Sequence, residues 1–410
     1  MGNSIDLSIL RKHAVVSSSV PLRIIGALGN SLLMLLALGT LGSFLPGLPG
    51  IGELGPILTA QLGLWTTILA AIGAAIVLLR WRANQRASTL LLAGLGAFAA
   101  LGSGYVHARQ IGVAVANGAQ IDLGEALLAS AQAHAGPKPT TIVYSRYDGQ
   151  DLPLDLYPPT GKLKAALAPV FVYIHGGGWG AETLKQRQAD YHWFARRGYL
   201  VISLEYPLSS KRRHTWNVAE PQLACALAWV GSNAAHFGGD AGRLALWGES
   251  AGGNLALNLS YRVNAGTLTP ACSGNISPVR AVMALYPVVD PARMYRPVDP
   301  LLAPFGRLMG DNYTGGSPEQ FPDRYKAIAS VTHIHAKAPP TLLVVPQADH
   351  LVDPNAATAF ASNAQAAGVE TRLITMPYAE HAFDLRSGGI GNQMVRQVML
   401  NFLKAHGLAP

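Results

Sequence analysis

Charged residues are scarce in this chain, since Asp, Glu, Lys and Arg make up only 13% of its 410 residues whereas half are hydrophobic. Its mean hydropathy is positive, which is typical of membrane spans attached to a soluble part. The formal charge of +8 comes from dispersed basic residues, and no basic stripe interleaved with aromatic residues occurs. The composition therefore argues against nucleic acid as a partner.

Cysteine is nearly absent, with Cys225 and Cys272 the only two. No C-x-x-C spacing occurs, so the sequence suggests no zinc site. If the part that holds the cysteines is exported, a disulfide is possible, and two buried free thiols are an equal alternative. His333 and His335 have a possible metal spacing, but no further ligand lies nearby, which favours a structural role. We expect neither a metal nor an organic cofactor.

Charge is missing altogether from three apolar segments near the N-terminus, residues 24–45, 57–79 and 87–106. The first covers about 33 Å as a helix, enough to cross a bilayer. We therefore predict three transmembrane helices in residues 1–106, rather than buried core helices. Because no Asp, Glu, Lys, Arg or His lies inside them, nothing indicates a transport path. The segments are expected to be an anchor, with the lipid bilayer as their partner.

Lys and Arg are concentrated on one side of these segments. Arg11, Lys12 and Arg23 precede the first, and Arg80, Arg82 and Arg86 lie between the second and third. The loop between the first and second has Glu53 and no Lys or Arg. The positive-inside rule then predicts a multi-pass protein of the plasma (inner) membrane, with a cytoplasmic N-terminus and everything after residue 106 outside. A cleaved signal peptide is the alternative for the first segment.

Residues 107–140 are polar and alanine-rich and end in Gly136-Pro137-Lys138-Pro139, so we predict a juxtamembrane connector there. Beyond it, short apolar runs alternate with helical segments. The predicted strands are 141–146, 152–157, 170–174, 200–204, 244–247, 281–286, 341–345 and 371–375, and the predicted helices are 184–197, 218–234, 253–263, 354–367 and 393–406. The alternation predicts an α/β domain over residues 141–410, with a mostly parallel sheet and helices on both faces. The Pro- and Gly-rich insertion at 290–322 is expected to form a partial cap.

The apolar run 244–247 leads directly into Gly248-Glu249-Ser250-Ala251-Gly252, a G-x-S-x-G pattern. Such a pattern places a serine on a strained turn between a strand and a helix, and its glycines let the backbone pass close by. Five residues alone are a weak signal. Here strand, turn and following helix occur in the required order, so we predict Ser250 as a nucleophile at a helix N-terminus.

The run 170–174 is followed by His175-Gly176-Gly177-Gly178-Trp179. Consecutive glycines let backbone N–H groups point at a developing oxyanion, and each such donor contributes a factor of about 10²–10³ in rate. Together with the serine turn downstream, this loop predicts an oxyanion hole that the Ala251 N–H completes.

A serine nucleophile needs a base, and the base needs an orienting carboxylate. Asp349 follows the strand 341–345 and His381 follows the strand 371–375, so Ser250, Asp349 and His381 occur in the chain order of this architecture. Three other residues are candidates for these roles. Asp353 precedes Pro354 and is better explained as a helix N-cap. His350 is adjacent to the acid and cannot easily reach across to it, and His175 more simply braces the glycine loop.

The motifs that carry a family resemblance are His175–Trp179, Trp247–Gly253, Asp349–Val352 and His381–Phe383. In this order they resemble the α/β-hydrolase fold serine esterases of the hormone-sensitive-lipase-like group, especially the bacterial carboxylesterases that are BD-FAE-like. The resemblance covers about residue 141 to the C-terminus and not the membrane region. It implies Ser250 as nucleophile, His381 as base and Asp349 as orienter, with the N–H groups of Gly177, Gly178 and Ala251 as oxyanion hole.

One segment departs from the resembled family. Tyr206-Pro207-Leu208 and the basic residues that follow stand where relatives usually have Tyr-Arg-Leu, so substrate preference does not carry over. The expected function is a membrane-anchored, lipase-like serine carboxylester hydrolase that acts on a small or lipid-like ester through an acyl-enzyme. Two alternatives are open: an acyltransferase or deacylase of an envelope lipid or polysaccharide, and a catalytically inactive scaffold with this fold.

Overall fold

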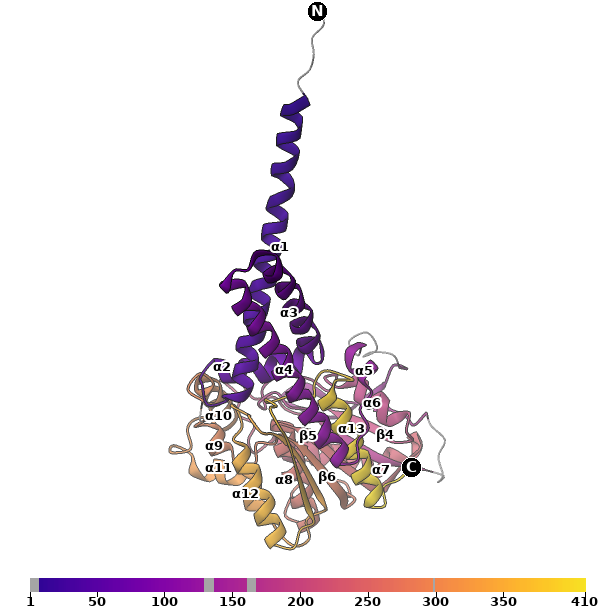
Figure 1. The fold of residues 1–410 in the computed structure, drawn as a ribbon. Helices are drawn as coiled ribbons and strands as arrows, with labels where there is room; N and C mark the ends of the chain where they lie inside the picture. The colour runs from indigo at the N-terminus through magenta and orange to yellow at the C-terminus, as the bar shows by residue number, and fades with distance from the viewer. Residues whose placement is uncertain (1–6, 129–135, 161–166, 298) are drawn as a thin grey trace, which may run out of the picture. The chain divides into compact units, whose positions relative to one another are not determined.

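The protein, described here from a computed structural model, divides into two compact units, residues 1–108 and 109–410 (Figure 1). The structure describes every residue except 1–6, 129–135, 161–166 and 298. The boundary between the units falls inside one long helix, α4 (Ala87–Ala116).

Before α4, the first unit contains the helices α1 (Leu7–Phe44), α2 (Ile51–Leu62) and α3 (Trp65–Asn84). Three helical stretches are long and apolar enough to cross a membrane: Ile24–Phe44, Trp65–Asn84 and Ala87–Ala116. Small residues let these helices approach closely. Ala70 and Ala99, for example, are fully buried against Leu36. The Thr67 and Ser103 hydroxyls lie 2.9 Å apart, which satisfies a polar pair between α3 and α4.

The second predicted span, residues 57–79, differs from the structure at both ends. The helix α2 ends at Leu62, and α3 begins at Trp65 and continues to Asn84. Gly63 has φ 55° and ψ −138°, a conformation that only glycine adopts easily and that interrupts the helix. Hydropathy alone does not detect such a break, because the residues on both sides of Gly63 are apolar.

The second unit is built on one eight-stranded sheet with the order β1-β2-β4-β3-β5-β6-β7-β8. Its strands are β1 (Thr140–Tyr147), β2 (Gln150–Tyr157), β3 (Ala168–Ile174), β4 (Leu200–Leu204), β5 (Gly239–Glu249), β6 (Val279–Leu285), β7 (Thr341–Pro346) and β8 (Thr371–Met376). β1 and β2 pair antiparallel to each other and β2 pairs antiparallel to β4, whereas every pairing from β4 to β8 is parallel. The predicted α/β fold class is confirmed.

Helices cover both faces of this sheet (Figure 1). The α-helices after α4 are α5 (Leu123–Leu128), α6 (Gln188–Ala195), α7 (Ala219–Asn233), α8 (Ala251–Ala265), α9 (Pro291–Met294), α10 (Ala303–Thr314), α11 (Pro322–Ile328), α12 (Pro354–Ala366) and α13 (Ile390–Ala405). Successive side chains of β3 point to opposite faces. Val170 and Val172 join the core under α7, α8 and α12, whereas Phe171 and Tyr173 join the core under α6 and α13.

The segment predicted as a connector, residues 107–140, is partly built into the second unit. α4 continues to Ala116, and Ala114 and Ala119 are buried in the core beneath α13. Backbone groups after α4 bond to side chains of α13: the Gln120 N–H to Gln397 at 2.8 Å and the Asp122 N–H to Gln393 at 2.7 Å. A polar, alanine-rich composition fits a helix packed on one side as well as it fits a linker, so the sequence alone does not distinguish the two.

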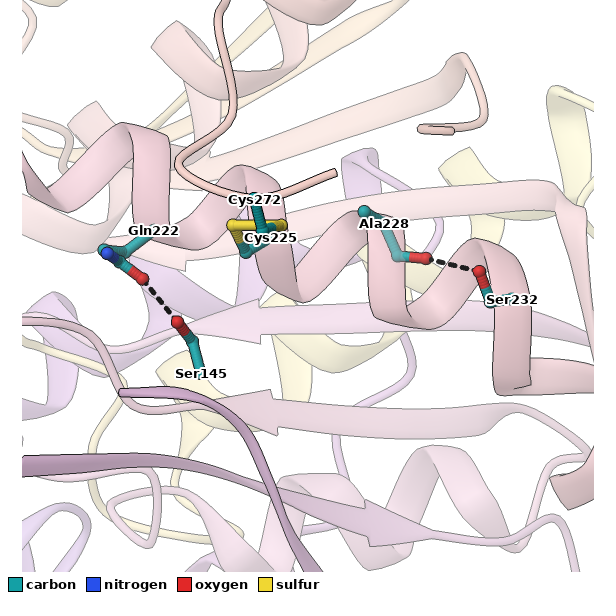
Figure 2. Close-up of a disulfide and its surroundings, with 6 residues drawn as sticks. All are labelled: Ser145, Gln222, Cys225, Ala228, Ser232 and Cys272. Atoms are coloured by element: carbon teal, nitrogen blue, oxygen red, sulfur yellow. Dashed lines mark hydrogen bonds between the residues drawn. A yellow bond between two sulfur atoms is a disulfide. The ribbon is translucent and has the colours of Figure 1, made fainter. Parts of the chain in front are cut away.

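Cys225 of α7 and Cys272, in the loop between α8 and β6, form a disulfide (Figure 2). Their Cα atoms lie 5.7 Å apart, within the usual range for a disulfide. The two cysteines are 47 residues apart in the chain. In the chain-entropy description, closing such a loop stabilises the fold by about 4 kcal/mol. The bond ties the long α8–β6 loop to the helix that packs beside α8, and it resolves the alternative that the sequence left open.

Candidate active site

Ser250 lies at the sharp turn between β5 and α8, with φ 53° and ψ −120°. This backbone conformation is strained for a residue other than glycine and persists only where the surroundings fix it. Two backbone hydrogen bonds do so: the Ser250 N–H donates to Leu285 O at 2.9 Å, and its carbonyl accepts from the Val288 N–H at 3.2 Å. The turn lifts the hydroxyl out of the sheet, as the G-x-S-x-G pattern predicts.

The glycines around Ser250 are required by close backbone approaches. A Cβ on Gly252 would lie 2.2 Å from the Ile174 carbonyl oxygen and 2.3 Å from that of His175. The start of α8 is thus pressed against the end of β3, where the glycine loop begins. Ala251 is the first residue of α8, so its N–H has no acceptor within the helix and remains available to a bound oxyanion.

His381 and Asp349 lie beside Ser250, in the loops after β8 and β7. The His381 Nε2 atom is 3.0 Å from the Ser250 Oγ, and its Nδ1 atom is 2.8 Å from the Asp349 Oδ2. The structure therefore brings together the three residues that the sequence predicts as nucleophile, base and orienter. They come from three neighbouring loops at the carboxyl ends of parallel strands, which is where such sheets place ligands.

The Asp349 carboxylate is fixed by its own loop. Its Oδ1 atom accepts hydrogen bonds from the Leu351 N–H at 3.0 Å and the Val352 N–H at 2.7 Å, which leaves Oδ2 for His381. Burial by itself lowers the pKa of His381, but the charge of Asp349 and its hydrogen bond raise it, and the charges of Glu380 and Glu249 raise it by a smaller amount. The net pKa of His381 is raised above the usual value for histidine, 6.5.

The glycine loop has a left-handed backbone at two of its glycines, with φ 85° at Gly177 and 59° at Gly178. Its neighbours hold it rigidly. The Tyr206 hydroxyl lies 3.1 Å from the carbonyl oxygens of both His175 and Gly176, which share its one proton. Met309 of α10 covers the loop, since a Cβ on Gly178 would lie 2.6 Å from its sulfur. The predicted cap segment 290–322, which includes α9 and α10, thus reaches the glycine loop.

The Trp179 that closes this loop is fully buried. Its ring stacks on Tyr313 of α10 with a centroid distance of 4.5 Å and an interplanar angle of 1°. The glycine loop is thereby packed from both sides, by Tyr206 and by α10.

The other histidines and the aspartate that the sequence offers as alternative base, orienter or metal ligand bond to other groups. His175 bonds through Nε2 to Glu205 at 3.0 Å, and His350 bonds to Glu380. The Asp353 side chain accepts the Asn355 N–H at 2.9 Å and caps α12, as predicted. His333 and His335 each contact a backbone carbonyl through Nε2, those of Ala327 and Tyr261, both at 2.8 Å, so their side chains do not converge on an ion site.

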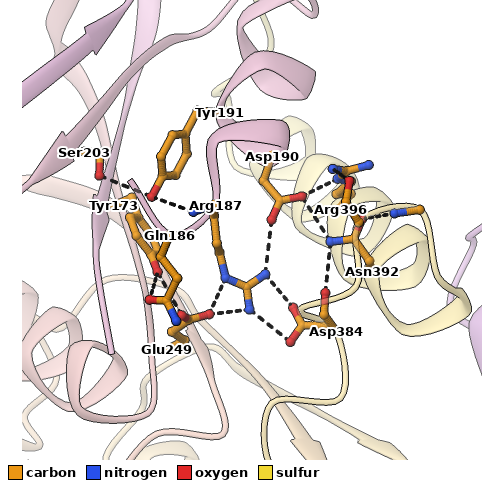
Figure 3. A network of polar contacts seen from close by, with 12 residues as sticks. Tyr173, Gln186, Arg187, Asp190, Tyr191, Ser203, Glu249, Asp384, Asn392 and Arg396 are labelled. Carbon is orange, nitrogen blue, oxygen red and sulfur yellow. Dashed lines mark hydrogen bonds and ion pairs between the residues drawn. The ribbon is translucent and has the colours of Figure 1, made fainter. Parts of the chain in front are cut away.

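Sequence reasoning missed a buried cluster of ions beside Ser250 and His381. Arg187, just before α6, contacts Glu249 and Asp384 (Figure 3). The sequence held one signal of it: a carboxylate stands next to Ser250 and another stands three residues after His381, both among apolar residues. Two such carboxylates need a buried cation, but nothing in the sequence identifies which of the many arginines supplies it.

Comparison with known proteins places this chain among esterases. A family model described as BD-FAE matches residues 154–363. The esterase LipQ of Mycobacterium tuberculosis is 29% identical over 262 residues, which cover 62% of this chain and 59% of LipQ. The carboxylesterase NlhH of the same species is 39% identical over 114 residues, which cover 27% of this chain and 34% of NlhH. The hormone-sensitive lipase of Bos taurus is 30% identical over 218 residues, or 47% of this chain and 27% of the lipase.

The match therefore spans less than two thirds of the length of these curated relatives. Among solved structures, native esterase 2 of Thermogutta terrifontis resembles this chain with a TM-score of 0.55 and 24% identity, covering 67% of this chain and 94% of the esterase. At this identity the likeness establishes the shared fold.

We predict that Gly252→Ala destabilises the second unit. The added methyl group overlaps the carbonyl oxygens of Ile174 and His175, so the start of α8 must move away from β3. The expected loss is about 1–3 kcal/mol, the usual cost of overpacking. It is measured as a lower midpoint of denaturant unfolding for the full chain in detergent. Gly112→Ala, where a Cβ meets nothing within 4 Å, is the control and should be neutral or slightly stabilising. Equal midpoints for the two variants would contradict the prediction.

Proposed function

The chain belongs to the BD-FAE family, and from that membership we propose that it is a membrane-anchored serine carboxylic ester hydrolase. The observation that carries the proposal is the continuous hydrogen-bonded line from Asp349 through His381 to the Ser250 hydroxyl. A hydroxyl with a histidine nitrogen at 3.0 Å, and a carboxylate behind that histidine, is the arrangement that makes serine nucleophilic at neutral pH.

In the proposed first step, the Ser250 Oγ attacks the carbonyl carbon of the ester while its proton moves to the His381 Nε2. The Asp349 carboxylate accepts the Nδ1–H, which fixes the imidazole in the required tautomer and stabilises the imidazolium. The negative charge that develops on the carbonyl oxygen is stabilised by the N–H groups of Gly177, Gly178 and Ala251. Because α8 begins at Ala251, the positive end of its dipole also faces this charge.

The tetrahedral intermediate then collapses. The bond from the carbonyl carbon to the alkoxy oxygen breaks, and the leaving alcohol takes the proton from His381. Water repeats the sequence on the acyl-enzyme: His381 removes a proton from it, the hydroxide adds to the carbonyl carbon, and Ser250 leaves with the proton returned. The products are an alcohol and a carboxylic acid, and the side chains return to their starting state.

The names of the relatives support an ester as the class of substrate. They include an esterase, a carboxylesterase and, in Pseudomonas putida, an ethyl acetate hydrolase, which is 26% identical over 256 residues. The three apolar helical stretches, which are long enough to cross a membrane, support a lipid-like ester as a candidate beside a small one.

The proposal also includes a location: the second unit lies on the extracytoplasmic side of the plasma (inner) membrane. Two independent features support it. Arg80 and Arg82 at the end of α3, and Arg86 before α4, favour a cytoplasmic position for that turn, and one further crossing by α4 leads outside. The disulfide between Cys225 and Cys272 is typical of an oxidising compartment outside the cytoplasm.

We predict that the full chain in detergent hydrolyses p-nitrophenyl acyl esters and that Ser250→Ala and His381→Ala each lower kcat by about 10⁴–10⁶, because either change removes the nucleophile–base pair. Asp349→Asn is expected to lower kcat by about 10⁴, since the amide stabilises the wrong imidazole tautomer. Asp353→Asn is the matched control, because Asp353 caps α12 and pairs with Arg293 but contacts neither Ser250 nor His381, and it should keep kcat.

Two results would contradict the assignment as an ester hydrolase. A folded chain without turnover on any acyl length, and without labelling of Ser250 by a fluorophosphonate, would indicate an inactive scaffold. Turnover in which added alcohols or sugars take most of the acyl group would indicate an acyltransferase.

We predict that the acid limb of the pH profile of kcat/KM has its midpoint above pH 6.5. The base must be neutral, and the pKa of His381 is raised, so activity is lost as the pH falls through that raised pKa. In Asp349→Asn the charge that favours the imidazolium is gone, so the limb of the residual activity should move to lower pH. A wild-type midpoint below 6.5, or a limb that Asp349→Asn leaves in place, would count against His381 as the base.

We predict the membrane orientation from cysteine labelling. In a variant with Cys225 and Cys272 replaced by serine, Ser362→Cys on the exposed face of α12 should react with a membrane-impermeant maleimide on intact cells. Asn84→Cys, exposed at the end of α3, should react only after the cells are permeabilised. The reverse pattern would place the second unit in the cytoplasm.

A further inference from the structure

Arg187 is a fully buried arginine that bonds to three carboxylates. Its side chain is 2% exposed. It donates from Nε to Glu249 and from NH1 to Asp190 at 3.1 Å (Figure 3). With Asp384 it forms a two-pronged contact, NH1 to Oδ2 at 2.9 Å and NH2 to Oδ1 at 3.0 Å. All three carboxylates are also buried, so these bonds are made in a low-dielectric environment where their geometry is tightly fixed.

Two of these carboxylates belong to the segments that carry the reacting groups. Glu249 immediately precedes Ser250, and Asp384 is three residues after His381. Arg187 itself stands just before α6, in a third segment. One guanidinium therefore ties the turn after β5 to the loop after β8, the two elements whose separation sets the distance from Ser250 Oγ to His381 Nε2.

Tyr286 extends this link to the imidazole. Its hydroxyl accepts from Arg187 NH2 at 2.8 Å and lies 2.8 Å from Asp384 and 3.2 Å from Glu249. Its ring packs edge-on against the His381 ring, with centroids 4.7 Å apart at an angle of 61°. The Tyr286 backbone has φ 36°, a strained value for a non-glycine residue at the end of β6, and that conformation aims the side chain into the cluster.

The charges of this cluster do not make it a simple source of stability. Three carboxylates face two arginines, Arg187 and Arg396, the latter bound to Asp190. Burial raises the pKa of Glu249, and the Arg187 charge opposes that rise. Buried ion clusters often stabilise a fold no more than well-packed apolar residues do, because desolvation offsets their attraction. Unlike apolar contacts, this cluster is directional. The planar guanidinium of Arg187 can bond to the Glu249 and Asp384 carboxylates together in only one geometry.

We propose that Arg187 is a positioning residue for the Ser250–His381 pair, acting through Glu249, Asp384 and Tyr286. The proposal rests on the proposed function, because it concerns the efficiency of that same pair. Arg187 touches neither Ser250 nor the ester. Its part is to hold the two loops so that the hydroxyl and the imidazole meet at hydrogen-bonding distance, where an error of about 1 Å costs on the order of 10²-fold in rate.

The test compares Arg187→Lys, Arg187→Met and Tyr286→Phe in the full chain, with kcat and KM measured on one p-nitrophenyl ester. Arg187→Met should lower kcat by about 10–100-fold and leave KM within about threefold. The loops that carry Ser250 and His381 then no longer hold the two side chains at hydrogen-bonding distance, while the ester-binding surface is unchanged. Arg187→Lys keeps the charge but not the fork, so its kcat should lie between those of Arg187→Met and wild type. Tyr286→Phe keeps the ring and loses the hydroxyl, and a smaller loss of kcat is expected.

Arg262→Met is the matched control. It breaks another ion pair of the second unit, between the partly exposed Arg262 and the buried Glu220, that contacts neither Glu249 nor the His381 loop. It should lower the unfolding midpoint and keep kcat. A second check uses Asp384→Asn: if Arg187 acts through Asp384, the kcat loss from Arg187→Met should be much smaller in that background.

The rate at which a fluorophosphonate labels Ser250 provides a readout that does not depend on ester turnover. It should fall in the same order as kcat, and it is read on the folded fraction only. If Arg187→Met does not fold, Arg187→Lys and Tyr286→Phe decide the question, and wild-type kcat and labelling rate in both would overturn the proposal. A wild-type chain that is labelled but turns over no ester would defeat the proposed function, and the labelling rates of the variants would still test the role of Arg187.

Discussion

The strained turn at Ser250 is the feature on which the rest of the site depends. A φ of 53° at a serine persists only where the surrounding backbone holds it, and here β6 and the residues that follow it supply the two hydrogen bonds that do so. The turn also brings α8 so close to the end of β3 that no side chain fits at Gly252. Because β3 continues directly into the glycine loop, one packing contact fixes both the turn at Ser250 and the glycine loop.

The parallel sheet supplies the other partners. Neighbouring parallel strands end at the same edge, so the loops after β5, β7 and β8 converge although their residues are far apart in the chain. The order of the strands brings the loops that carry Asp349 and His381 near Ser250, but it does not by itself set the distances between the side chains. The hydrogen bonds of Asp349 to its own loop, and the Arg187 cluster between the other two loops, account for the remaining precision.

The sequence predicted the features that depend on local pattern. Each buried strand is a short apolar run, and the motifs around Ser250, His175, Asp349 and His381 follow their strands directly, so the α/β fold and the grouping of these residues could be read in advance. It did not predict the break at Gly63, because apolar residues flank it, nor the packing of residues 109–122 on α13, because alanine suits a buried helix face and a linker equally. Arg187 was invisible for a third reason: its partners are brought to it by the tertiary fold.

The ion cluster lies beside Ser250 and His381, where apolar packing alone would hold the two loops together without fixing their exact position relative to each other. Phe171, Tyr173 and Trp247 fill this side of the sheet with aromatic rings. Their hydrophobic attraction is non-directional, so it does not by itself fix the position of one layer when the layers slide by a fraction of an ångström. A bidentate contact between a guanidinium and a carboxylate loses its hydrogen bonds under the same slide. Two side chains that must meet from different loops, such as Ser250 and His381, need a directional restraint of this kind. The desolvation cost of burying Arg187 with three carboxylates is therefore understandable at this place in the fold, where direction matters more than net stability.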